Sequence, residues 1–176
     1  MDLSMMIEDI KFNYRAGLMI QKDDSILVEV NPDIDFVTIP GGRVKTMESS
    51  LAALQRELKE EMQVDILDTE VKMKALIENF FEMNGKKYHE LYILYKTTVD
   101  DYDTRFTNDM INHDSDASYY KWVKISDLAK ENLLPVVLRT LSNDDKFQNI
   151  INDDFKKEED IDWYLFCIEE SKETLA

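Results

Sequence analysis

Acidic side chains gather in a short segment that follows a glycine turn. Residues 42–64 read GRVKTMESSLAALQRELKEEMQV and hold four glutamates around Arg56: Glu48, Glu57, Glu60 and Glu61. At about 100° of rotation per residue, a helix would bring the last three glutamates together, where like charges repel one another. A hard divalent cation would relieve that repulsion, because Mg²⁺ takes oxygen ligands and keeps room for substrate phosphates. The segment therefore indicates a metal site that could activate water for attack at phosphorus.

The same glutamates allow a second interpretation, a helix face in solvent, because Glu is a strong helix former that often occurs in such runs. The apolar residues of the segment share a different stripe, which should pack on a sheet: Leu51, Leu54, Leu58 and Met62. The helix would then have one buried side and one acidic side that can face a cleft. A carbonyl group of the Gly41-Gly42 turn could provide a further oxygen ligand.

Elements that would position this helix can be placed from local patterns. Apolar alternation and turn signals predict strands at 12–20, 25–30, 36–39, 71–81, 87–98 and 119–124. Asn84-Gly85 predicts a tight hairpin between the fourth and fifth of these strands. Helices are expected from an N-cap at Ser49 or Ser50 to about residue 62, at 127–130 and at 135–141. Hairpins and interspersed helices, without repeated βαβ units, indicate an α/β or α+β fold with a mixed sheet.

Composition narrows the functional classes. A chain of 176 residues predicts one domain, and a formal charge of −16 opposes binding to duplex DNA or to anionic lipid. The single cysteine, Cys167, excludes an intrachain disulfide and fits a reducing compartment. The sequence carries no signal-peptide pattern and no apolar run of about 20 residues. We therefore expect a cytoplasmic protein with no nucleic acid and no membrane as partner.

The full pattern of the acidic segment resembles the Nudix box of Nudix hydrolases. The matching residues are Gly42, Glu48, Arg56-Glu57-Leu58, Glu60-Glu61 and Val64. Gln63 stands where the family usually has a glycine that ends the helix. The FNYR strand, the Pro-Gly-Gly lead-in and the NGKKYHE turn extend the resemblance over about 11–141.

The resemblance implies a fold and a metal site. Residues 1–142 are expected to form a Nudix hydrolase domain, an α/β/α sandwich around a mixed, largely antiparallel sheet. The cofactor would be Mg²⁺ or Mn²⁺, held by the Gly41 carbonyl, Glu57, Glu60 and Glu61, with one of these glutamates a candidate general base. Glu48 and Arg56 would pair and support them.

For each candidate site residue outside the Nudix box, two alternative roles remain. Glu90 is the candidate catalytic base in the strand at 87–98, and a solvated strand position is the alternative. Arg15 interrupts an apolar strand, so it could bind phosphate or form a salt bridge at the strand edge. Phe80 and Phe81 point to opposite faces of their strand, so one should be core and the other could stack on a base.

The expected reaction is hydrolysis of a phosphoanhydride bond in a nucleoside diphosphate-X compound, of the nucleoside triphosphate or nucleotide-sugar type. The substrate would be a small nucleotide, and water would attack phosphorus. The alternative is a catalytically silent Nudix-like module that binds a nucleotide or a partner. Residues 143–176 form an acidic extension, packed on the same domain or at a homodimer interface through the apolar patch at 163–168.

Overall fold

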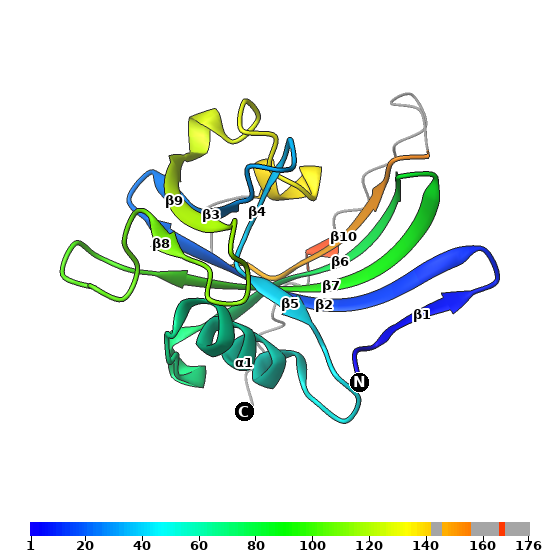
Figure 1. Ribbon diagram of the computed structural model, residues 1–176, viewed down its shortest axis with the longest axis horizontal. Coiled ribbons are helices and arrows are strands. Elements are labelled where there is room, and N and C mark those ends of the chain that lie inside the picture. The colour runs from blue at the N-terminus through cyan, green and yellow to red at the C-terminus, as the bar shows by residue number, and fades with distance from the viewer. Residues whose placement is uncertain (142–145, 156–165, 168–176) are drawn as a thin grey trace, which may run out of the picture.

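A mixed β-sheet with one α-helix below it organises the chain in the computed structural model, which describes residues 1–141, 146–155 and 166–167 (Figure 1). Within these residues, 11 strands join one sheet, whose main path runs β11-β10-β6-β7-β2-β3-β9-β8. The strands are β1 (Ser4–Ile7), β2 (Ile10–Lys22), β3 (Ser25–Val30), β4 (Val37–Thr38), β5 (Gly41–Arg43), β6 (Lys72–Met83), β7 (Lys86–Thr98), β8 (Met110–Ile111), β9 (Tyr119–Lys124), β10 (Gln148–Asp153) and β11 (Phe166–Cys167).

Two long strands form the centre of the sheet. β2 lies parallel to β7 from the pair Ile10 and Lys87 to the pair Gln21 and Thr98. β6 and β7 form the expected antiparallel hairpin, with Gly85 at a φ of 71° in its turn. Of the strand pairs described, β2 with β7 and β10 with β6 are parallel and the others are antiparallel. The sheet is therefore mixed and largely antiparallel, as predicted.

The helix α1 (Ser50–Met62) begins and ends where its sequence indicates. The Ser49 side chain accepts a hydrogen bond from the Ala52 N–H at 3.1 Å, which caps the first turn. At the other end Gln63 adopts a φ of 58°, the left-handed conformation that glycine takes most easily. Gln63 thus supplies the same helix end as the usual glycine, at some conformational cost.

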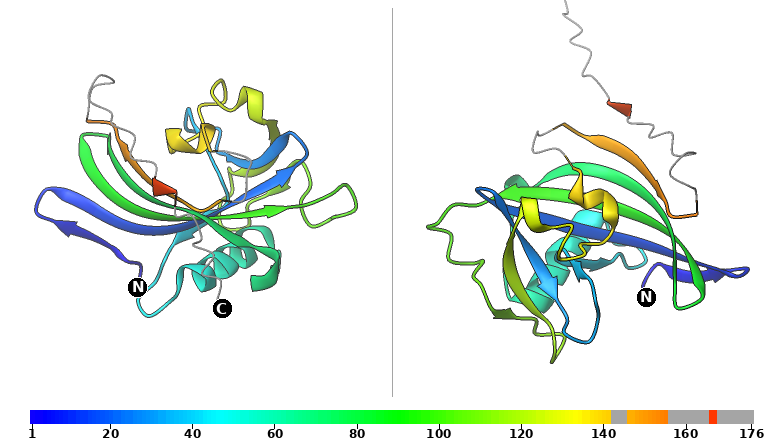
Figure 2. Two further views of the ribbon diagram at one scale, coloured as in Figure 1. Left: turned by 180° about the vertical axis from the view of Figure 1, so that it is seen from behind. Right: turned by 90° about the horizontal axis from the view of Figure 1, so that it is seen from above.

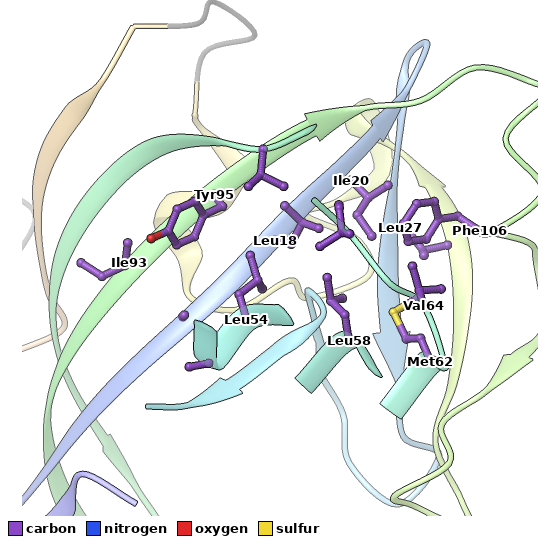
Figure 3. Close-up of a cluster of buried hydrophobic side chains, with 14 of the residues drawn as sticks. Leu18, Ile20, Leu27, Leu54, Leu58, Met62, Val64, Ile93, Tyr95 and Phe106 are labelled. Atoms are coloured by element: carbon purple, nitrogen blue, oxygen red, sulfur yellow. The ribbon is translucent and has the colours of Figure 1, made fainter. Parts of the chain in front are cut away.

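Apolar side chains from α1 and from one face of the sheet build the first core. Leu54, Leu58 and Met62 of the helix contact Leu18 and Ile20 of β2, and all five are buried (Figure 3). Side chains alternate along β2, so Met19 points to the opposite face and joins a second core there. The two cores explain why the central strands are apolar on both faces.

The face opposite α1 is covered by β4 and by short 3-10 helices, at the top of Figure 1. The α-helices expected at 127–130 and 135–141 are instead the 3-10 helices Ile125–Asp127 and Val136–Arg139. These segments offer too few residues to repay the cost of nucleating an α-helix, whereas a 3-10 turn needs only three or four. Leu133, Val137 and Leu138 still bury their side chains in the second core.

Four of the described strands were not expected from the sequence: β1, β5, β8 and β10. Part of the acidic extension joins the sheet, because β10 lies parallel to β6 at its edge (Figure 2). β11 pairs with β10 through Phe166 and Cys167, and the rest of the apolar patch predicted at 163–168 lies outside the described residues. In the described part of the chain, no helix has the length and apolar character needed to cross a membrane.

The packing of α1 on the sheet leads to a prediction about stability. Leu58 is fully buried there, so Leu58→Ala should lower the free energy of unfolding by about 2–5 kcal/mol. The matched control is Leu67→Ala, because the Leu67 side chain is 63% exposed and should change stability by less than about 0.5 kcal/mol. Urea denaturation followed by circular dichroism measures both. Equal losses in the two variants would contradict this packing.

Candidate active site

One guanidinium gathers three of the four glutamates of the acidic segment. Arg56 grips Glu48 with two nitrogens, Nε to Oε1 at 2.8 Å and Nη2 to Oε2 at 3.0 Å. Its Nη1 lies 2.8 Å from Glu57 Oε1 and 3.0 Å from Glu60 Oε2. Nη2 also donates to the Arg43 carbonyl at 3.0 Å, which ties the helix to β5. The planar fork of arginine suits this many-sided pairing better than a lysine ammonium would.

The charges of this cluster stabilise one another. Hydrogen bonds from the Arg56 side chain, with a smaller contribution from the Lys45 N–H, hold the pKa of Glu48 below its ordinary value. Arg56 keeps its proton throughout, because the hydrogen bonds that it donates to Glu48 and then to Glu57 raise its pKa. Glu48 is therefore an ionised clamp on Arg56, which matches the supporting role predicted for the pair.

The glycine turn makes room for one of these carboxylates. Gly42 pairs with Ala16 of β2, and its Cα faces the Glu57 carboxyl group. A Cβ at position 42 would overlap the Glu57 carboxyl atoms. Gly41 has a φ of 141° and lies against the Ala16 carbonyl and Gly17, so a side chain there would meet backbone. Gly41 is therefore needed for the close approach of β5 to β2, and Gly42 leaves room for the Glu57 carboxyl group.

The fourth glutamate lies in a different set of contacts. Glu61 Oε2 accepts a hydrogen bond from the Tyr120 hydroxyl at 3.0 Å. Asn112 Nδ2 donates to that hydroxyl at 3.2 Å and to Glu29 Oε1 at 3.0 Å. Burial, and then the charge of Glu29, raise the pKa of Glu61 to about 8. Without a cation, Glu61 is thus largely protonated at neutral pH.

A pocket of about 360 Å³ opens on the face of the sheet opposite α1. Its walls combine apolar side chains, among them Phe36, Phe81 and Leu134, with polar groups on β2, β6, β7 and β10. Arg15 lies in this pocket, and its charge lowers the pKa of Glu61. Arg15 therefore lines the pocket and also interacts electrostatically with the carboxylate cluster.

The structure divides the predicted site residues between these two regions. Glu90 lies in the pocket, away from the helix glutamates, with its Oε2 at 3.9 Å from Arg15 Nε. Phe81 lines the pocket, whereas Phe80 packs on His89 with ring centroids 4.6 Å apart. Two roles were predicted for Arg15, a salt bridge and phosphate binding. Arg15 forms a salt bridge with Glu90 and also lines the pocket, so the structure is compatible with both roles.

Sequence reasoning missed the partners of Glu61. Glu29, Tyr120 and Asn112 come from β3, β9 and a loop, and no short spacing connects them. One signal was present: Glu29 is the only charged residue in the strand SILVEV. A charge inside an apolar strand is worth testing as a site residue.

The donor set fits a hard cation in its chemistry, though not in its present side-chain positions. No three acidic, histidine or cysteine side chains of the described residues stand close enough together to share an ion. Glu57 and Glu60 instead face Arg56. However, the half-buried Glu61 lies beside Glu29 and Glu57, and both carboxylates raise its pKa. Ionising all three without a further positive charge is unfavourable, so the cluster suits Mg²⁺ or Mn²⁺.

Comparison with known proteins identifies a family and supports the fold. The family model for the NUDIX domain matches residues 12–144. Among solved structures, the mutator MutT protein from Bacillus halodurans superposes with a TM-score of 0.57 at 16% identity, over 82% of this chain and 93% of that one. A MutT Nudix hydrolase from Burkholderia pseudomallei gives 0.56 at 18%, over 73% and 95%.

A C. elegans Ap4A hydrolase complex gives a TM-score of 0.51 at 23% identity, over 73% of this chain and 91% of that one. These structural likenesses concern the fold. A comparison with curated proteins finds no match.

The raised pKa of Glu61 predicts a pH effect on stability. In the folded protein the Glu61 carboxyl group keeps its proton up to about pH 8. In the unfolded chain the same group has the ordinary pKa of 4.5 and loses its proton near pH 4.5. The wild-type protein in EDTA should therefore lose stability as pH rises from about 4.5 to about 8. Glu61→Gln removes the ionisation and should raise Tm by a few degrees at about pH 9, with little change at about pH 5.

Differential scanning fluorimetry in EDTA measures this effect. Glu78→Gln is the control, because Glu78 lies exposed on β6 away from the cluster. A lower Tm for Glu61→Gln at high pH would contradict the buried, uncompensated carboxylate.

Proposed function

Since the chain belongs to the Nudix hydrolase family, whose model matches well over half of it, we propose that it uses Mg²⁺ or Mn²⁺ to hydrolyse a nucleoside diphosphate-X compound. The family match confirms the predicted Nudix family and the predicted enzyme class, a Nudix pyrophosphohydrolase. The structural neighbours confirm the α/β Nudix fold. The metal, the substrate and the roles of individual residues go further and are proposals.

The observation that carries the proposal is the Arg56 cluster together with Glu61. Arg56 holds Glu57 and Glu60 at the edge of α1, and Glu61 lies one position beyond them in the same turn. Arg15 is close enough to lower the pKa of Glu61. This supports a site in which carboxylates would bind a cation near a guanidinium that would bind phosphate, as phosphoryl transfer requires.

Glu57, Glu60, Glu61 and the Gly41 carbonyl are the groups that would hold the metal. When bound, a divalent cation neutralises a pyrophosphate and activates water. Glu48 and Arg56 orient these carboxylates, and Tyr120 donates to Glu61 and holds it in place. The proton-accepting group would be one of the helix glutamates.

Glu90 has contacts that favour a different role from the base expected of it. Its side chain is 7% exposed, it faces Arg15, and Asn79 Nδ2 donates to its Oε1 at 3.4 Å. We therefore assign to Glu90 the orientation of Arg15, which would bind a substrate phosphate. Phe81 would stack on a flat group of the substrate, because it lines the pocket and lies parallel to Tyr88 at 4.7 Å.

Substrates of the nucleoside triphosphate or nucleotide-sugar type fit a pocket next to a phosphate site. One fold neighbour is named as a hydrolase of Ap4A, so a dinucleoside polyphosphate belongs in the test as well. The chain is expected to act as a small-molecule enzyme, with no nucleic acid or membrane partner and with the homodimer as an open proposal.

A substrate panel with metal titration tests the activity. With Mg²⁺ or Mn²⁺, the protein should cleave at least one nucleoside triphosphate, nucleotide-sugar or dinucleoside polyphosphate, and EDTA should abolish the reaction. Glu60→Gln and Glu61→Gln should each lower kcat by roughly 10²–10³-fold, while Glu78→Gln should leave it unchanged. Nucleotide binding without turnover at any metal concentration would support the catalytically silent module instead. Unchanged turnover in both glutamine variants would assign the reaction to another site.

The clamp gives a second, subtler prediction. Arg56→Lys keeps the positive charge but cannot pair with Glu48 through two nitrogens and also reach Glu57 and Glu60. We expect kcat to fall about 10–100-fold and the metal concentration for half-maximal rate to rise. The control Arg139→Lys alters an arginine that contacts Leu133 and Asn132 on the opposite face. Wild-type metal dependence in Arg56→Lys would show that its charge alone is sufficient.

A further inference from the structure

A row of buried polar residues crosses the sheet under the pocket. Asn152 of β10 lies opposite Asn79 of β6, Asn79 opposite Glu90 of β7, and Glu90 opposite Asn13 of β2. All four residues are at most 6% exposed. Burying adjacent polar groups in a sheet is unfavourable unless they bond to one another or to something else. The row therefore calls for an explanation beyond packing.

Hydrogen bonds fix the orientation of the two side-chain amides in this row, Asn79 and Asn152. Asn79 Nδ2 donates to Glu90 Oε1 at 3.4 Å, so the Asn79 carbonyl faces the other way. Asn152 Nδ2 donates to that carbonyl oxygen at 2.6 Å and also to Asp154 Oδ1 at 3.2 Å. Carboxylates at both ends of the chain of contacts can only accept, which settles the orientation of both amides.

As a result, acceptors dominate the polar lining of the pocket. Both amide hydrogens of Asn152 are used within the row. Among the described residues, four carboxylates line the pocket, Asp35, Glu82, Glu90 and Asp154, against one cation, Arg15. Within the described residues, Arg15 Nε has no hydrogen-bond partner, and the Arg15 side chain is 31% exposed, so its guanidinium can bind an acceptor on a ligand. Away from Arg15, the pocket repels anions and favours hydrogen-bond donors.

The outer end of the row comes from outside the part that matches the family. The family model ends at residue 144, whereas Asn152 and Asp154 follow it on and after β10. The Asp154 N–H donates to the Phe80 carbonyl at 2.9 Å, which continues the pairing of β10 with β6 and holds Asp154 at the rim. The C-terminal strand thus contributes directly to the pocket wall.

We propose that Asn152 and Asp154 are specificity-determining residues, and that the pocket selects a flat heterocycle carrying an exocyclic amino group. The ring would lie among Phe36, Phe81 and Leu134, and its amino group would donate to Asp154. Asn152 is a positioning residue that holds Asp154 and Asn79. This deepens the proposed function on which it rests, because it names the substrate class by its donor group.

Two pairs of nucleoside monophosphates isolate the amino group. GMP differs from IMP by the 2-amino group, and AMP differs from purine riboside monophosphate by the 6-amino group. Calorimetry should give at least roughly tenfold tighter binding for the amino-bearing member of one pair, since a hydrogen bond to a carboxylate is worth about that much. Asp154→Asn should reduce this ratio to near one, and Asn152→Ala should reduce it in part.

Asp153→Asn is the matched control, because it removes the same charge from the neighbouring position, which is not part of the pocket lining. Equal Kd values within both pairs for the wild type, no binding of any monophosphate, or an unchanged ratio in Asp154→Asn would overturn the proposal. Asp154 is exposed at the rim, so its variant should fold, and a wild-type Tm confirms this.

Turnover separates this inference from the proposed function. If the corresponding triphosphates are never hydrolysed but the binding ratio depends on Asp154, the pyrophosphohydrolase proposal for these substrates fails and the pocket proposal stands. If they are hydrolysed at equal kcat/KM within each pair, the enzyme proposal stands and the specificity proposal fails.

Discussion

The pairing of Arg56 with Glu48, Glu57 and Glu60 is the contact on which the rest of the site depends. Three like charges next to one another would repel, and a single guanidinium with five donors holds them in one region. The same group reaches the Arg43 carbonyl, so it also fastens α1 to β5. Local geometry serves this contact: Gly42 has no side chain, which lets the Glu57 carboxyl group lie against the strand.

The two faces of the sheet carry different parts of the candidate site. Below the sheet, α1 contributes the glutamates and buries its leucines against β2. Above it, the 3-10 helices and β4 leave a pocket over β6 and β7. Arg15 belongs to the pocket, yet its charge acts on Glu61. A substrate with its phosphates at this arginine would extend toward both regions, which is the geometry expected of a nucleoside diphosphate-X compound.

The parallel strand β10 gives this chain a pocket wall that the family match does not include. Because β10 pairs with β6 in register, Asn152 stands directly opposite Asn79 and continues its hydrogen bonds. A shift of one residue would turn Asn152 to the other face of the sheet and leave Asn79 without this partner. Under our proposal, this added strand would change selectivity without altering the glutamates on α1.

Local patterns in the sequence were sufficient to place the acidic helix α1 and several strands. The buried stripe through Leu58 and the bounds of β3 and β9 follow from short-range patterns, and the N-cap is Ser49, one of the two serines expected. The fold and family predictions are confirmed. The roles of the site residues stay predictions. Only the tertiary structure brought Glu29 and Tyr120 to Glu61, and Asn152 to Asn79. Those neighbours depend on the register between strands far apart in the chain, which no local spacing records.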